Sequence, residues 1–142
     1  MDNDPFALAR FVTAQDSSGT YRRAVAELRA GRKTSHWMWF IFPQIAGLGF
    51  SDMARKYAIS GLAGARAYLG HPVLGPRLRE CAAAVLAVED STADRILGPV
   101  DAMKLRSSMT LFAAAAPDEP VFADVLARYF DGQPDQATLD RL

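Results

Sequence analysis

The chain has 142 residues, 50% of them hydrophobic and 23% charged, which is enough for one globular domain and excludes a disordered chain. Sixteen Lys and Arg residues balance sixteen Asp and Glu residues, so the composition excludes a protein that holds nucleic acid by bulk positive charge. The single cysteine excludes an internal disulfide, and no apolar run approaches the roughly 18 residues that span a bilayer.

The N-terminus is acidic and has no long apolar stretch, so it is not typical of a signal peptide. We therefore expect a single domain over residues 1–142, located in the cytoplasm and without a membrane partner. The sequence leaves the oligomeric state open and favours a monomer.

Helix signals begin near the N-terminus. Asp4 followed by Pro5 is a capping residue before a first-turn proline, and this pair predicts a helix over 5–15. Thr20 is the expected cap of a second helix, which ends where Gly31 can adopt a left-handed conformation.

The pattern changes over residues 32–50, where four aromatic residues lie within six positions. Pro43 stops any helix in this segment, and Gly47 and Gly49 loosen the backbone. We expect this segment to be the one long stretch without a regular helix.

Helix signals resume after residue 50 and continue to the C-terminus. In chain order they predict a short helix capped by Ser51, a helix over 62–70, the longest helix over 72–88, a two-turn helix capped by Ser91, a helix over 99–116, a helix from Pro120 to Phe130 and a final turn capped by Asp135.

The residue composition supports the same fold class, since 25 Ala and 14 Leu stand against 18 Val, Ile and Thr taken together. We predict an all-α domain of seven to nine helices, at least 60% helical, with no sheet beyond a stray two-residue bridge. Several helices are short, which favours an irregular helical array over a regular four-helix bundle.

Familiar catalytic and metal-binding motifs are missing from the sequence. His36 and His71 are 35 residues apart, and no spacing indicates a metal site, so we expect no metal and no cofactor. Cys81 lies on the apolar stripe of the 72–88 helix, where a cysteine usually behaves as a small buried hydrophobe.

The segment from Ser35 to Gln44, SHWMWFIFPQ, is the most informative in the chain. Aromatic burial in the core explains much of it. The same cluster is also suited to form the wall of a site for a flat ligand, because it combines stacking surface with a few orienting polar groups. The sequence leaves these two interpretations open.

A second polar group lies on the 99–116 helix, where Asp101, Lys104 and Ser108 share one face and Ser107 lies beside them. A carboxylate, an ammonium and two hydroxyls on one stripe are suited to hold a phosphate or a sugar. The alternative is a solvated face with one ordinary Asp–Lys pair.

Five strings of residues, taken in order and spacing, resemble the domain-of-unknown-function 1810 family of small bacterial proteins. They are HWMWFIFPQ at 36–44, GLG at 47–49, YAI at 57–59, AxxYLxHPxLGxRL at 65–78 and DxxKLxSSMTLF at 101–112. The resemblance covers nearly the whole chain and implies a compact, mostly helical fold with no established activity.

The resemblance also implies that a set of polar residues matters beyond an apolar core: His36, Gln44, Ser51, Tyr57, His71, Arg77, Asp101, Lys104, Ser107 and Ser108. Ser51 and His71 each precede a helix, where a side-chain acceptor caps backbone N–H groups. The presence of Arg77 in this set is explained if the apolar part of its side chain covers neighbouring helices.

Three functional hypotheses remain, and the sequence alone does not decide whether the protein is an enzyme. The first is a site for a small anionic ligand that is nucleotide-like or ADP-ribose-like, a class indicated by a looser resemblance to NAD- and ADP-ribose-associated small helical proteins. The second is a protein-interaction module that uses the aromatic segment without catalysis. The third is a compact protein whose polar residues only support the fold.

Under the first hypothesis we expect the 36–44 segment and the 101–108 stripe to meet across one cleft. His36 is the predicted general acid/base, because its imidazole titrates near neutrality. The predicted ligand-binding residues are Trp37 and Trp39 for stacking, Gln44 and Asp101 for orientation, and Lys104 with Ser107 and Ser108 for the anion.

Overall fold

The structure is a computed structural model that describes residues 3–142, of which about 64% are helical. Its elements in chain order are α1 (Ala9–Asp16), the 3-10 turn η1 (Ser17–Gly19), α2 (Thr20–Arg29), α3 (Met38–Ile41), α4 (Asp52–Lys56), α5 (Leu62–Gly70), α6 (Leu74–Leu86), α7 (Ala93–Leu97), α8 (Pro99–Ala115), α9 (Pro120–Phe130) and α10 (Gln136–Leu139).

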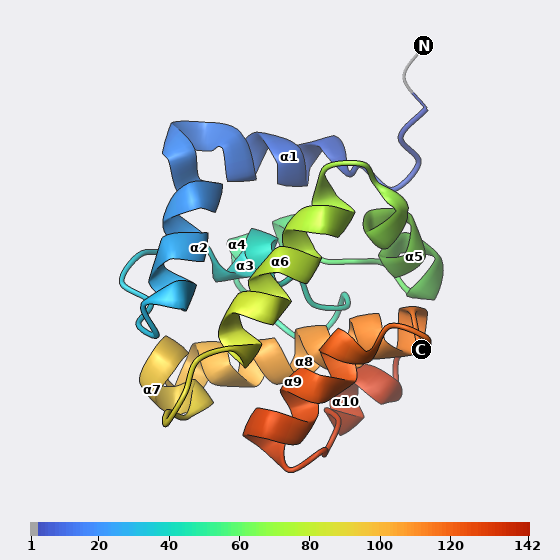
Figure 1. Cartoon of the computed structure of the whole chain (residues 1–142). Coiled ribbons are helices and arrows are strands. Elements are labelled where there is room, and N and C mark those ends of the chain that lie inside the picture. Colours follow the sequence, from blue (N-terminus) through green and yellow to red (C-terminus); the bar gives the residue numbers. More distant parts are fainter. Residues whose placement is uncertain (1–2) are drawn as a thin grey trace.

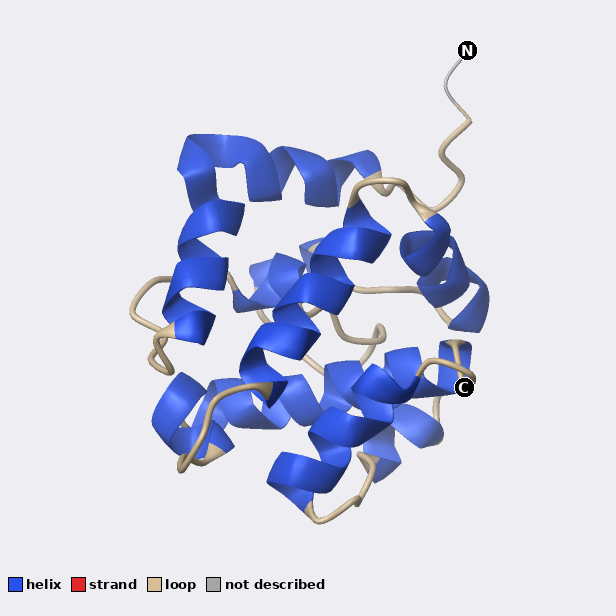
Figure 2. Ribbon diagram, in the orientation of Figure 1, coloured by secondary structure: helices blue, strands red, loops and turns tan. Residues whose placement is uncertain are grey.

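The predicted all-α class is confirmed. Residues 3–142 contain no strand, and their one β-type pairing is an isolated parallel bridge between Ile45 and Ile59 (Figure 2). None of the helices in this part of the chain is long and apolar enough to cross a membrane.

Two helices organise the domain. In Figure 1, α8 crosses the lower half of the molecule and α6 runs diagonally in front, while α1 lies along the top. The 17-residue α8 packs against α5, α7, α9 and α10, and α6 packs against α2, α5 and α9. The irregular array therefore places the two longest helices in contact with most of the others.

The core is held together by a continuous series of buried rings. Phe11 of α1 meets Tyr68 of α5 edge-on, with ring centroids 5.2 Å apart. Tyr68 in turn packs on Phe112 of α8 at 5.4 Å, and Phe112 packs on Phe122 of α9 at 5.9 Å. These contacts join four helices through side chains that carry a large apolar area each.

Buried Gln15 of α1 lies beside this series and satisfies its amide within the chain. Its Nε2 donates to the Phe40 carbonyl at 2.8 Å and to the Tyr68 hydroxyl at 3.2 Å, and its Oε1 accepts from Arg77 at 3.2 Å. Arg77 also forms an ion pair with Asp16 at 2.9 Å, so it does more than cover its neighbours with an apolar stem.

Several predicted helix ends are confirmed by their capping bonds. Ser51 accepts from the Ala54 amide at 3.1 Å, and Asp135 accepts from the Thr138 amide at 3.2 Å. His71 accepts at Nδ1 from the amides that open α6, at 3.1 and 3.2 Å. Gly31 follows α2 with a φ of +73°, the left-handed conformation expected of a C-terminal glycine.

The predicted start of the first helix is wrong. Asp4 does accept hydrogen bonds, from the amides of Leu8 and Ala9 at 2.8 and 3.0 Å. However, Ala7 has a φ of +53°, which interrupts the helical path, and α1 begins only at Ala9.

The predicted caps Thr20 and Ser91 are wrong for a related reason. Gly19, with a φ of +69°, occupies the N-cap position of α2, and the Thr20 hydroxyl instead donates backwards to the Ser17 carbonyl at 2.7 Å. At α7 the cap is the next residue, Thr92, whose side chain accepts from the Arg95 amide at 3.1 Å.

Packing at the start of α6 predicts a strong effect of one glycine substitution. A Cβ on Gly75 would lie 2.1 Å from the Leu69 carbonyl oxygen, which is backbone and cannot rotate away. We expect Gly75→Ala to lower the free energy of unfolding by about 2–3 kcal/mol in urea titrations.

Gly70→Ala is the matched control, because a Cβ there has open space around it. We expect its free energy of unfolding to stay the same or rise by up to about 1 kcal/mol. Equal destabilisation by both substitutions would contradict the packing described at Gly75.

Cys81 lies in the core, as its position on the apolar stripe predicted. Burial raises the pKa of its thiol to about 12, and the neighbouring Glu80 carboxylate adds to the shift. We expect slow labelling by a thiol reagent in the native protein and fast labelling in urea. Cys81→Ala should lower the free energy of unfolding by about 1 kcal/mol. Rapid labelling of the native protein would contradict a buried Cys81.

Candidate functional site

The site region is anchored by a buried carboxylate on α2. Glu27, which is only 9% exposed, accepts hydrogen bonds from the amides of Thr34 and Ser35 at 2.7 and 3.0 Å. It also accepts from the Ser35 hydroxyl at 2.5 Å and from the Trp37 indole N–H at 3.0 Å. One side chain thus fixes the loop that leads into the aromatic segment.

These bonds determine the charge state of Glu27. Burial by itself raises the pKa of the carboxyl group, but the hydrogen bonds from Ser35, Thr34 and Trp37 favour the ionised form and outweigh burial, so the pKa falls to about 2. Glu27 is therefore ionised at neutral pH and holds its donors by charge-assisted bonds.

A series of alternating charges connects this anchor to α8. The ammonium of Lys33 lies 5.1 Å from the centre of the Trp37 ring and forms an ion pair with Asp101 at 2.8 Å. Asp101 also lies 3.5 Å from the ammonium of Lys104, which in turn lies 5.1 Å from the centre of the Trp39 ring. The 33–39 segment and the start of α8 are thereby held together by ion pairs and cation–π contacts.

Beside this series is a cavity of about 300 Å³ between the 44–49 loop, α8 and α10. Its polar lining consists of the side chains of Gln44, Lys104, Ser107 and Asp135. Its apolar lining is formed by Leu48, Gly49, Val100, Met103 and Ala137. Residues separated by about 60 positions in the chain therefore surround one hollow.

Hydrogen bonds join two residues of the cavity lining to the C-terminal turn. The Ser107 hydroxyl donates to the Asp135 carboxylate at 2.9 Å, and the same carboxylate accepts from the Thr138 hydroxyl at 2.6 Å. Thr110 accepts from the Asp135 amide at 2.9 Å. Ser107 consequently has a structural role, the docking of α10 onto α8, in addition to its place in the cavity.

Residues 5–142 match the model of a family described as Protein of unknown function (DUF1810). The chain belongs to this family. The crystal structure of the conserved hypothetical protein Rv1873 from Mycobacterium tuberculosis is similar to it, with a TM-score of 0.94 and 52% identity over 98% of each chain. No curated protein matches the chain. The resemblance identified from the motifs is therefore confirmed, and the names of these relatives assign no ligand or reaction.

The structure brings some of the sequence-predicted site residues of this family member together and separates others. Gln44, Lys104 and Ser107 line one cavity, and Asp101 and Trp39 contact Lys104 beside it.

Trp37 and Ser108 lie elsewhere, in the core with no exposed surface, although both are predicted ligand contacts. Trp37 is buried because its indole reaches Glu27, and the Ser108 hydroxyl has no hydrogen-bond partner within residues 3–142. His36 is exposed and does not line the cavity.

Three residues of this arrangement are not among the site residues predicted from the sequence. Glu27 lies between the apolar residues Val25 and Leu28 on the buried face of α2, and a carboxylate at that position was a usable signal. For Asp135 the sequence predicts only a capping role, and Lys33 has no local signal because its partner is on α8. Among residues 3–142, no group of three or more His, Cys, Asp or Glu is placed to hold a metal ion.

The lowered pKa of Glu27 predicts a pH-dependent contribution to stability. Because the folded pKa, about 2, lies below the ordinary value of 4.5, the contribution is complete above about pH 4.5 and is lost as the pH falls towards 2. We expect Glu27→Gln to lower the free energy of unfolding by about 2 kcal/mol at pH 7. The difference from wild type should shrink between pH 4.5 and 2 in urea titrations.

Glu89→Gln is the control, because Glu89 is exposed and makes no hydrogen bond within the described residues. It should have little effect at any of these pH values. If the difference in free energy of unfolding between the wild type and Glu27→Gln did not change with pH, an ionised, hydrogen-bonded Glu27 would be contradicted.

Proposed function

We propose that the cavity between the 44–49 loop, α8 and α10 binds a small nucleotide-like ligand, of ADP-ribose-like chemistry. The observation that carries the proposal is the convergence of an amide, an ammonium and a hydroxyl, from Gln44, Lys104 and Ser107, on one partly apolar hollow. Ligand sites typically combine mainly apolar walls with a few placed polar groups. The volume of about 300 Å³ is at the small end of such sites, so the cavity holds one part of such a ligand, either its ring or one sugar phosphate.

Lys104 is the proposed contact for anionic oxygens of the ligand. Its ammonium is held between the Asp101 carboxylate and the Trp39 ring, at 3.5 Å and 5.1 Å, so little side-chain freedom remains to be lost on binding. An ammonium has three N–H donors, and these contacts leave at least one for a ligand.

Gln44 is the proposed contact for the polar edge of a ring. Gln44 lines the cavity, and its side-chain amide has no hydrogen-bond partner within residues 3–142, so both donors and an acceptor are free for a ligand. Asp135 contributes a carboxylate to the same lining, which favours a ligand with donor groups as well as anionic oxygens. This mixed requirement is consistent with a nucleotide-like molecule.

The proposal concerns binding. His36 does not line the cavity, so its role as a general acid/base stays a prediction from the sequence. The Trp39 ring contacts the Lys104 ammonium rather than the ligand in this arrangement. Trp37 and Ser108 are fully buried and have no ligand contact in this proposal.

A second candidate function, a protein-interaction surface, is favoured by one observation. Three large apolar side chains near the cavity are strongly exposed: Phe50 is 79%, Val100 67% and Met103 72% exposed. The aromatic segment itself is mostly buried, so a partner would contact these three residues rather than the aromatic residues of 36–44.

The ligand hypothesis predicts a specific effect of Lys104→Ala. With ADP-ribose or AMP as the probe, we expect the melting temperature of the wild-type protein to rise with ligand concentration, by mass action. Lys104→Ala should weaken the affinity at least ten-fold and change the melting temperature without ligand by no more than about 2 °C, because a partly exposed ammonium contributes little to stability.

Arg95→Ala is the control, since Arg95 is exposed on α7 and its side chain has no partner within the described part of the chain. It should keep the wild-type response. An unchanged affinity of Lys104→Ala, or no response of the wild type to either nucleotide, would overturn the proposed site and favour the interaction surface.

A further inference from the structure

A second cavity, of about 330 Å³, lies on another part of the molecule and shares no lining residue with the first. It is formed by the N-terminal segment, α1, the end of α4 and the beginning of α5. Its charged lining residues are Arg10 of α1 and Arg55 of α4, and no Asp or Glu lines it within residues 3–142. The cavity therefore has two positive charges that its own walls do not neutralise.

Arg10 is held in this cavity by uncharged acceptors. Its Nη1 donates to the Lys56 carbonyl at 2.6 Å and its Nη2 to the Ala58 carbonyl at 2.8 Å, while its guanidinium lies 4.8 Å from the centre of the Phe11 ring. These bonds cap the C-terminal end of α4, which is a sufficient structural role for the side chain.

Capping α4 uses only two of the five N–H donors of Arg10. The Nε is buried and has no hydrogen-bond partner within residues 3–142. Nor does Arg10 have a carboxylate within ion-pair distance in that part of the chain. A partly buried guanidinium without a counter-charge is unfavourable, so an anion beside it would stabilise the site.

Arg55 gives the same pocket a second, less constrained cation. Its side chain is exposed and has no ion pair or hydrogen bond within the described residues. Arg55 and Arg10 come from different helices and line one hollow, so an oxyanion between them would receive donors from two directions.

The first turn of α5 faces this cavity as well. Ser60 and Gly64 both line it, and α5 begins between them at Leu62. The N-cap residue Gly61 provides no side-chain cap, so the first N–H groups of α5 have no side-chain acceptor. This helix end adds partial positive charge and N–H donors to those of the two arginines.

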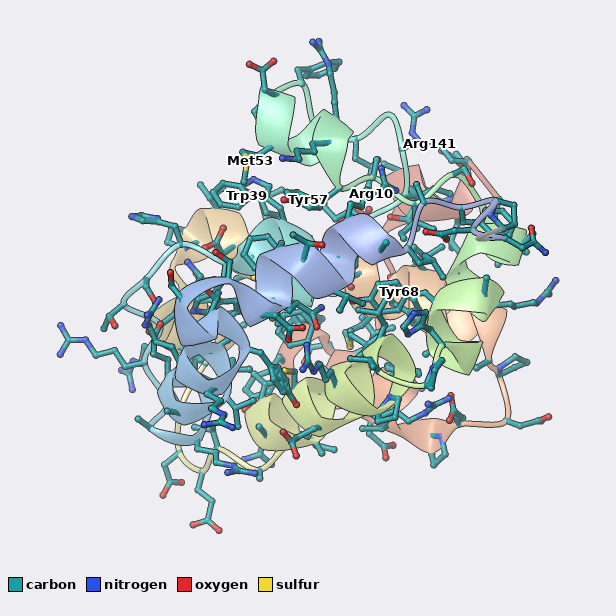
Figure 3. All side chains as sticks on the ribbon, turned by 90° about the horizontal axis from the view of Figure 1, so that it is seen from above. Arg10, Trp39, Met53, Tyr57, Tyr68 and Arg141 are labelled. Carbon is teal, nitrogen blue, oxygen red and sulfur yellow. The ribbon has the colours of Figure 1, made fainter. Side chains whose placement is uncertain are left out.

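The charges near this cavity have both signs. The carboxylate of Asp4, in the same N-terminal segment, accepts from the amides of Leu8 and Ala9, which lower its pKa and keep it ionised, but Asp4 does not line the cavity. A third arginine, Arg141, lies against the adjacent loop, where a Cβ on Gly47 would come within 2.6 Å of its Nη1. Figure 3 places Arg10 and Arg141 on the same side of the molecule.

We propose that this second cavity binds the phosphate group of a soluble small molecule. Arg10, Arg55 and the first turn of α5 are the donors, and the apolar walls formed by Phe6 and Ile59 accommodate the organic part of the molecule. Three groups of donors suit a phosphate, which presents oxygens in several directions, better than a planar carboxylate. The site is independent of the proposed nucleotide-like site, although the 44–49 loop contributes Ala46 here and Gln44 there.

The test uses sodium phosphate and sodium pyrophosphate as probes, with sodium chloride and sodium acetate at equal ionic strength as reference salts. We expect phosphate or pyrophosphate at ten times its Kd to raise the wild-type melting temperature by about 3 °C over the reference salts. Amide NMR shifts should change at Ser60–Gly64 and at Arg55. If acetate raised the melting temperature as much as phosphate does, the site would bind carboxylates in general, and the assigned ligand class would be wrong.

Arg55→Ala is the first variant, because Arg55 is exposed and its loss should leave the fold unchanged, whereas Arg10 also caps α4. We expect at least ten-fold weaker phosphate binding for Arg55→Ala and partial recovery for Arg55→Lys, while Arg95→Ala binds like wild type. Lys104→Ala should also bind phosphate like wild type, which separates this site from the proposed nucleotide-like site. A wild-type phosphate response in Arg55→Ala, or loss of the response in Lys104→Ala, would overturn the proposal.

Discussion

The ionised carboxylate of Glu27 is the interaction on which the arrangement around α8 depends. It lies at the end of α2, it is almost fully buried, and it accepts four hydrogen bonds from the loop that follows. A buried carboxylate is tolerated only when such donors replace its hydration shell, so the loop must adopt the one path that supplies them. That path brings the Trp37 indole into the core.

The position of the Trp37 ring then determines where the next charges lie. Lys33 packs its ammonium against this ring and is only 9% exposed, so it needs the Asp101 carboxylate as a counter-charge. Because Asp101 is on the first turn of α8, the ion pair also joins the start of that helix to the loop. Lys104, one turn later, is held by the second oxygen of the same carboxylate and thereby reaches the cavity.

The two cavities differ in how their charges are balanced. In the first, Lys104 lies 3.5 Å from Asp101 and shares the lining with Asp135, so the local charge is mixed. In the second, Arg10 is held by carbonyl groups, which provide hydrogen bonds without charge, and Arg55 is unpaired within residues 3–142. Mixed charge suits a ligand with both donors and acceptors, whereas uncompensated positive charge suits an anion.

The sequence by itself determined the all-α class, the family and those helix ends that depend on one side chain, such as Ser51 and Asp135, because these features rest on contacts between near neighbours. It did not reveal the left-handed residues Ala7 and Gly19, which moved two helix starts. Only the tertiary structure decided that Gln44 and Lys104 share a cavity while Trp37 and Ser108 lie in the core. Those positions depend on contacts between distant segments, such as Lys33 with Asp101 and Arg10 with the end of α4, and periodicity along the chain carries no information about such pairs.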